Sequence, residues 1–66
     1  MRRALLEGRA VEYRFERRNR RTIGIRVNEH GLSVAAPMRA PWRDIEGFLQ
    51  EKAGWILDKL DKRAAA

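Results

Sequence analysis

The C-terminal part of the chain carries apolar residues at the spacing of a helix. Over residues 41–63 they recur every three or four positions, which at about 100° per residue places them on one broad face. That face holds Trp42, Ile45, Phe48, Leu49, Ala53, Trp55, Ile56 and Leu60. Pro41 suits the first helical turn, and Asp44 near the start and Arg63 near the end complement the helix dipole. The pattern predicts one helix of ~23 residues, roughly 34 Å long, which could cover a small sheet.

Before this helix, apolar and polar residues alternate with the period of two that is typical of strands with one buried face. Residues 2–6 are predicted to form a short first strand, which ends at a turn where Gly8 can take a positive φ. Residues 10–18 are predicted to form the second strand. Its apolar residues are Val11, Tyr13 and Phe15, and they alternate with Glu12, Arg14 and Glu16.

The alternation is interrupted at residues 17–21, RRNRR, where Asn19 tolerates a left-handed turn conformation. The interruption predicts a hairpin turn rich in arginine. A further strand follows over residues 23–27, and after a second turn at residues 28–31 another alternating strand runs to Pro37. The apolar residues of these strands are Ile23, Ile25, Val27, Leu32, Val34 and Ala36.

Together the patterns predict an α+β fold, in which a small antiparallel β-meander of three to four strands is covered on one face by the long C-terminal helix. The connection at residues 37–41 is too short for a linker between domains, so residues 1–66 are predicted to form a single module. A chain of this length buries only ~60% of its unfolded surface, and its stability is expected to be marginal.

Three residues of the predicted helix do not fit a self-sufficient unit. Gly47 and Gly54 lie together on its outward face, where each costs about 1 kcal/mol relative to alanine. Lys52 lies near the middle of the apolar face, so its stem is expected to pack while its ammonium reaches solvent or a carboxylate. One interpretation is that another domain packs here; the other is that a small helix tolerates such imperfections.

The net charge of +6 is unevenly distributed. Residues 1–26 hold nine arginines and three glutamates, whereas residues 27–66 hold six basic and six acidic groups. The excess favours an anionic partner such as nucleic acid, an acidic protein surface or a membrane headgroup, although a merely solvated face is equally compatible. The candidate anion-binding residues are Arg14, Arg17, Arg18, Arg20, Arg21 and Arg26.

Composition excludes several classes of site. With no cysteine and one histidine, the chain offers neither a disulfide nor a closed zinc site, and no cofactor is expected in these residues. Isolated glycines do not form a phosphate loop, and Ser33 has no plausible catalytic partners. No apolar run approaches ~18 residues and the N-terminus lacks a signal-peptide core, so we expect a cytoplasmic protein without a membrane partner.

Three features in combination resemble the N-terminal region of a known family. They are the strand opening at residues 20–23, RRTI; Gly31 before an alternating strand that ends at Pro37; and Lys52 three residues before Trp55. On these features the chain, over about residues 5–62, is similar to the YgjP-like metal-dependent hydrolases, zinc metallopeptidase relatives of the SprT-like group.

The resemblance implies a parent enzyme that uses zinc-bound water. Family members carry an H-E-x-x-H helix, in which two histidines bind zinc and the glutamate acts as general base. This motif is absent here, because His30 is the sole histidine and Glu29 precedes it. An inverted motif would need histidine where Arg26 stands. No catalytic or metal-binding residue can therefore be carried over, and the chain is expected to be a fragment or a reduced descendant without the catalytic domain.

Two main hypotheses for function follow, and a protein-interaction domain or a nonfunctional remnant is a further alternative. In the first, the chain is an N-terminal, non-catalytic module that supports or presents substrate to the catalytic domain of a parent hydrolase, with Gly47, Lys52 and Gly54 as packing positions. In the second, it is a stand-alone basic module that binds nucleic acid or phosphate through the arginine-rich hairpin. The second has a weakness, because Tyr13 and Phe15 share the apolar face and leave no exposed aromatic for base stacking.

Overall fold

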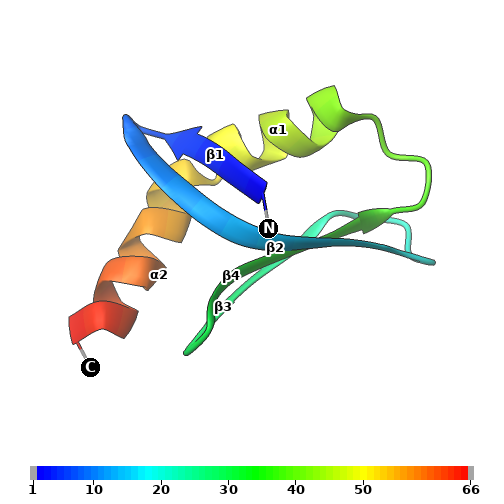
Figure 1. Cartoon of the computed structure of the whole chain (residues 1–66). Coiled ribbons are helices and arrows are strands. Elements are labelled where there is room, and N and C mark those ends of the chain that lie inside the picture. The colour runs from blue at the N-terminus through cyan, green and yellow to red at the C-terminus, as the bar shows by residue number, and fades with distance from the viewer. Residues whose placement is uncertain (1, 66) are drawn as a thin grey trace.

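A sheet and two helices form two layers in the computed structural model, which describes residues 2–65 (Figure 1). In chain order the elements are β1 (Arg2–Leu6), β2 (Arg9–Arg18), β3 (Gly24–Asn28), β4 (Gly31–Pro37), α1 (Trp42–Glu51) and α2 (Ala53–Ala65). Both helices lie on the same side of the sheet. The α+β class is therefore confirmed.

The strands are ordered β1-β2-β4-β3. The β1/β2 and β3/β4 pairs are antiparallel hairpins, but β2 and β4 pair in parallel at the centre. The predicted antiparallel meander is therefore wrong. Residues 19–23 carry the chain past the end of β4, so the predicted arginine-rich turn is a crossing connection and does not close a hairpin. Alternation could not reveal this, because it sets the face of each side chain and is the same for parallel and antiparallel neighbours.

The two hairpin turns follow from local chemistry. Glu7 and Gly8 both have positive φ, 49° and 83°, as a two-residue turn between twisted strands requires. In the β3/β4 turn the Asn28 side-chain oxygen accepts a hydrogen bond from the backbone N–H of His30 at 2.8 Å, and Gly31 has φ 109°. The first strand and both of these turns are therefore confirmed.

The predicted single helix is wrong, because the chain bends at Lys52, which has φ −98° and ψ 9°. Helical hydrogen bonding continues across the bend: the N–H of Lys52 donates to the Phe48 carbonyl at 3.0 Å, and that of Ile56 to the Lys52 carbonyl at 2.9 Å. The bend lets α1 pack beside β1 while α2 turns along β3 and β4. Apolar spacing continues through it, so the sequence pattern gives no sign of two helices.

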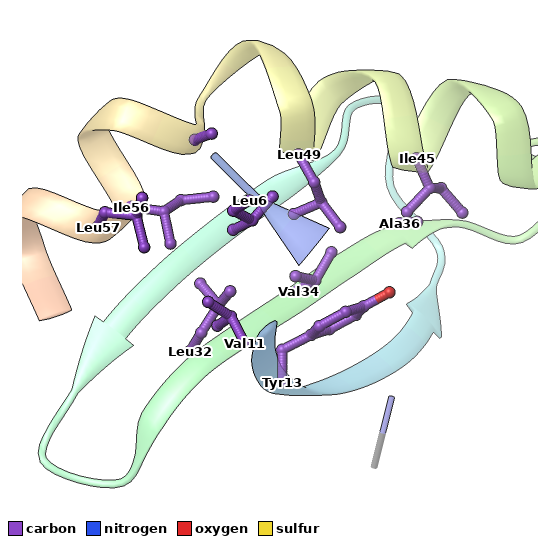
Figure 2. Close-up of a cluster of buried hydrophobic side chains, with 11 residues drawn as sticks. Leu6, Val11, Tyr13, Leu32, Val34, Ala36, Ile45, Leu49, Ile56 and Leu57 are labelled. Carbon is purple, nitrogen blue, oxygen red and sulfur yellow. The ribbon is translucent and has the colours of Figure 1, made fainter. Parts of the chain in front are cut away.

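The bend also changes which residues of α2 face the sheet. Ile56 and Leu57 are buried, whereas Trp55, predicted on the apolar face, is 45% exposed. The core lies between the layers and receives side chains from β1, β2, β4 and both helices (Figure 2). Its members are Leu6, Val11, Tyr13, Leu32, Val34, Ala36, Ile45, Leu49, Ala53, Ile56 and Leu57.

Candidate functional site

The face of the sheet that points away from the helices carries a row of polar residues across three strands. On β2, Arg14 is in register with Ser33 of β4, and Ser33 is in register with Arg26 of β3. The next row along the strands consists of Glu16, Ala35 and Gly24. Small residues of β4 therefore form a low floor between longer side chains of the flanking strands.

Two hollows of about 450 and 400 Å³ follow this floor, and they share Glu16, Ser33 and Val34. We call this combined surface the arginine trough. The polar and charged residues that define it are Arg14, Glu16, Arg18, Arg20, Arg26, Asn28 and Ser33.

The charges of the trough are unbalanced. Glu16 and Arg18 form an ion pair, in which Oε1 of Glu16 lies 2.8 Å from Nη2 of Arg18. Within residues 2–65, no carboxylate lies within ion-pair distance of Arg14, Arg20 or Arg26. Three guanidinium groups are therefore available to an anion, for which they provide charge-assisted hydrogen bonds.

Arg20 reaches the trough from the connection between β2 and β3. Its guanidinium lies directly over Gly24, where an added Cβ would stand only 2.7 Å from Nη2. Glycine at this position therefore leaves room for the arginine. The candidates Arg14, Arg18, Arg20 and Arg26 are brought together, although they lie on the outer face of the sheet and not at a hairpin end.

Arg17 points to the opposite face. Its Nη1 donates hydrogen bonds to the carbonyls of Pro37, Met38 and Ala40 at 3.0, 3.3 and 2.8 Å. These bonds hold the connection from β4 to α1. Its position in the alternation, two residues after Phe15, was the signal that it faces the helices. Arg21 is exposed in the connection before β3.

An aromatic cluster next to Arg17 was not predicted. The Phe15 and Trp42 rings have centroids 4.6 Å apart, and the guanidinium carbon of Arg2 lies 3.8 Å from the centroid of the Trp42 ring. The cluster fastens the start of α1 to β1 and β2. Cation–π contacts of this kind contribute about 0.5–1 kcal/mol at exposed sites.

The helical positions that suggested a packing surface have different surroundings. An added Cβ on Gly47 would meet nothing within 4 Å, whereas one on Gly54 would lie 3.4 Å from Oε2 of Glu7. Beside them, Gln50 Nε2 donates to the Leu5 carbonyl at 2.7 Å. Lys52 is exposed, with its ammonium 6.0 Å from the Phe48 ring. A packing role for these positions stays a prediction.

The chain was compared with models of known protein families to identify the family to which it belongs. The family model described as YgjP-like, metallopeptidase domain, matches residues 21–66, more than half of the chain. The chain belongs to the YgjP-like family. The YgjP-like match begins before β3 and includes β4, α1 and α2, while β1 and β2 lie outside it. No curated protein and no solved structure matched the chain.

Membership of the YgjP-like family implies zinc, but the residues described do not fit a zinc site. Among residues 2–65, no group of three or more His, Cys, Asp or Glu side chains is close enough to hold a metal ion. Nε2 of His30 lies 3.5 Å from Oε1 of Glu29, and both side chains are exposed on the turn between β3 and β4. Neither α1 nor α2 has the length and apolar character needed to cross a membrane.

Proposed function

We propose that these residues form the non-catalytic part of a YgjP-like metallopeptidase, inactive alone, which supports or presents substrate to a catalytic part that holds zinc. The observation that carries the proposal is the family match over residues 21–66 combined with the donor set of the chain. The matched segment forms two strands and two helices and contains one histidine. A zinc site of the usual kind needs three protein ligands, so they must come from other residues.

The partner in this proposal is the catalytic domain of a parent hydrolase. The helical surface around Gly47 is the proposed contact, because its backbone is open to close approach by another backbone. Lys52, at the bend, and Gly54, in the first turn of α2, are the other proposed contact residues. Adding a methyl group at Gly47 should weaken association with the catalytic domain while leaving the fold of these residues intact.

Zinc binding and proteolysis by the purified 66-residue chain test the proposal. We expect calorimetry to find no stoichiometric zinc binding at submicromolar affinity, and we expect casein to remain uncut. His30→Ala serves as the control, because any weak binding through His30 and Glu29 would disappear in that variant. Tight stoichiometric zinc binding, or zinc-dependent cleavage of casein, would overturn the proposal.

A stand-alone module that binds nucleic acid or phosphate remains the second candidate. The observation in its favour is the group of unpaired guanidiniums at Arg14, Arg20 and Arg26. Phosphate binding through arginines loses affinity steeply as salt rises. Oligonucleotide binding that is undetectable even at low salt would therefore remove this candidate.

A further inference from the structure

We propose that the arginine trough binds an extended peptide segment with acidic residues at alternate positions. The inference rests on the proposed function and deepens it, because it names the class of substrate that would be presented to the catalytic part. It is carried by the spacing of the arginines, the shape of the floor and the position of one paired glutamate.

The spacing of the arginines matches an extended chain. Arg14 and Arg26 start from the row centred on Ser33, and the Arg20 guanidinium lies over the next row, at Gly24. Rows two residues apart are separated by roughly 6.6 Å along a strand. Alternate side chains of an extended peptide have the same separation, so two acidic side chains at positions i and i+2 could each reach one row.

The floor of the trough suits a peptide backbone. Ser33 and Ala35 leave the sheet surface low between β2 and β3, and the hollow above them is about 450 Å³. The Ser33 hydroxyl can donate to a carbonyl or accept from an N–H of a bound chain. Glu16 lines both hollows, and its carboxylate can accept hydrogen bonds from peptide N–H groups.

The same features disfavour a nucleic acid as the occupant. Glu16 lines both hollows, and a phosphate backbone, unlike a peptide backbone, offers no N–H group to its carboxylate. Among the residues that line the two hollows, the one aromatic is Phe15, whose ring packs against Trp42 on the helical side. Bases would therefore find no aromatic stacking surface in the trough.

A second copy of the chain is also disfavoured. Two troughs facing one another would oppose the unpaired guanidiniums of Arg14, Arg20 and Arg26 with the same groups of the partner. Like charges that face one another across an interface between molecules are destabilising. Charge complementarity therefore selects an acidic occupant.

Binding to the 66-residue chain without zinc tests the inference. The probe is a fluorescein-labelled peptide with glutamate at every second position and threonine between, compared with the same peptide carrying glutamine for glutamate. Fluorescence anisotropy should show binding of the glutamate peptide only. The double variant Arg14→Gln/Arg26→Gln should bind it roughly tenfold more weakly, since two charge-assisted contacts are lost at an exposed site.

Arg39→Gln/Arg43→Gln is the matched control, because it also removes two charges, one from the connection before α1 and one from α1, outside the trough. It should leave affinity within about twofold, and circular dichroism should show that every variant is folded. Equal weakening by Arg39→Gln/Arg43→Gln would show diffuse charge attraction and overturn the inference. Tighter binding of a single-stranded oligonucleotide of equal charge, no peptide binding at low salt, or a dimer in light scattering would also overturn it.

Failure of the inference and failure of the proposed function can be told apart. The anisotropy measurement involves neither zinc nor cleavage, so an absence of peptide binding leaves the non-catalytic role standing. Zinc-dependent cleavage by the 66-residue chain would remove that role and would leave the measured peptide affinity unchanged.

Discussion

The two faces of the sheet come from the same strands but have opposite characters. Toward the helices, side chains such as Leu6, Val34 and Tyr13 are almost completely buried and pack against α1 and α2. Away from the helices, small residues of β4 lie between exposed arginines of β2 and β3. The first face supplies the hydrophobic free energy of folding, whereas the second leaves charged groups free for a partner.

The face of the sheet on which a charged side chain lies determines which groups that side chain can contact. Arg17 and Arg18 are neighbours in β2, and their side chains leave the sheet on opposite sides. Arg17 is committed to backbone carbonyls, whereas Arg18 is paired with exposed Glu16. Changes to the helix-covered face should therefore alter stability, and changes to the trough should alter binding.

The largest effect is expected from the core. Ile45→Ala removes a fully buried side chain of α1 and should lower the free energy of unfolding by about 2–5 kcal/mol, enough to unfold much of a small domain. Leu5→Ala is the control, since Leu5 is 63% exposed, and should change stability by less than about 0.5 kcal/mol. Urea unfolding, monitored by tryptophan fluorescence, measures the unfolding free energy of both variants. Similar losses in the two variants would contradict the difference between the two faces.

A smaller effect is expected at the neighbouring arginines. Arg17→Met keeps an apolar stem but removes three hydrogen bonds to the connection before α1, and should cost about 1–3 kcal/mol in unfolding free energy. Arg18→Met breaks an exposed ion pair and should cost less than about 1 kcal/mol. Chemical denaturation of the two variants under identical conditions checks the difference. A larger loss of unfolding free energy in Arg18→Met than in Arg17→Met would contradict the structural role given to Arg17.

The open glycine of α1 predicts a gain in stability. Gly47→Ala places a methyl group in open space and should raise the unfolding free energy by about 0.5–1 kcal/mol. Gly8→Ala should lower it by roughly 1–2 kcal/mol, because Gly8 has φ 83°. Thermal unfolding by circular dichroism measures both shifts. A loss of stability in Gly47→Ala would show that the surface around it is already occupied.

Gly24→Ala is expected to give the smallest change in stability, but it should also weaken binding of the acidic peptide. Gly24→Ala forces the Arg20 guanidinium from its place over the strand, which a flexible side chain can leave at a cost below about 0.5 kcal/mol. Affinity for the acidic peptide should nevertheless fall, because Arg20 is displaced from the trough. Anisotropy and urea unfolding on the same sample separate the two readouts, and unchanged affinity would exclude Arg20 from the site.

Much of the local structure could be predicted from the sequence. Alternation placed Val11 and Tyr13 inside and Arg14 outside, and Gly8 was recognised as a turn residue from its conformational freedom. These features depend on neighbours in the chain. The strand order could not be predicted, because the same alternation is compatible with β3 or β4 beside β2.

The site was only partly predictable for the same reason. The individual arginines were identified, but the row formed by Arg14, Ser33 and Arg26 exists only because β4 lies between β2 and β3. The position of Arg20 over Gly24 depends on the crossing connection, which was expected to be a hairpin. The bend at Lys52 also could not be predicted, because the apolar spacing continues through it.

The parallel pairing of β2 with β4 has a consequence for the order of folding. Each hairpin closes through local contacts, which form in about 1–10 μs, whereas the β2/β4 pair joins residues such as Tyr13 and Leu32 that are distant in sequence. We therefore expect docking of the two hairpins to be slower than closure of either one. Because Arg14 belongs to one hairpin and Arg26 to the other, the trough comes into existence at that step, and a bound peptide would slow unfolding by holding the hairpins together.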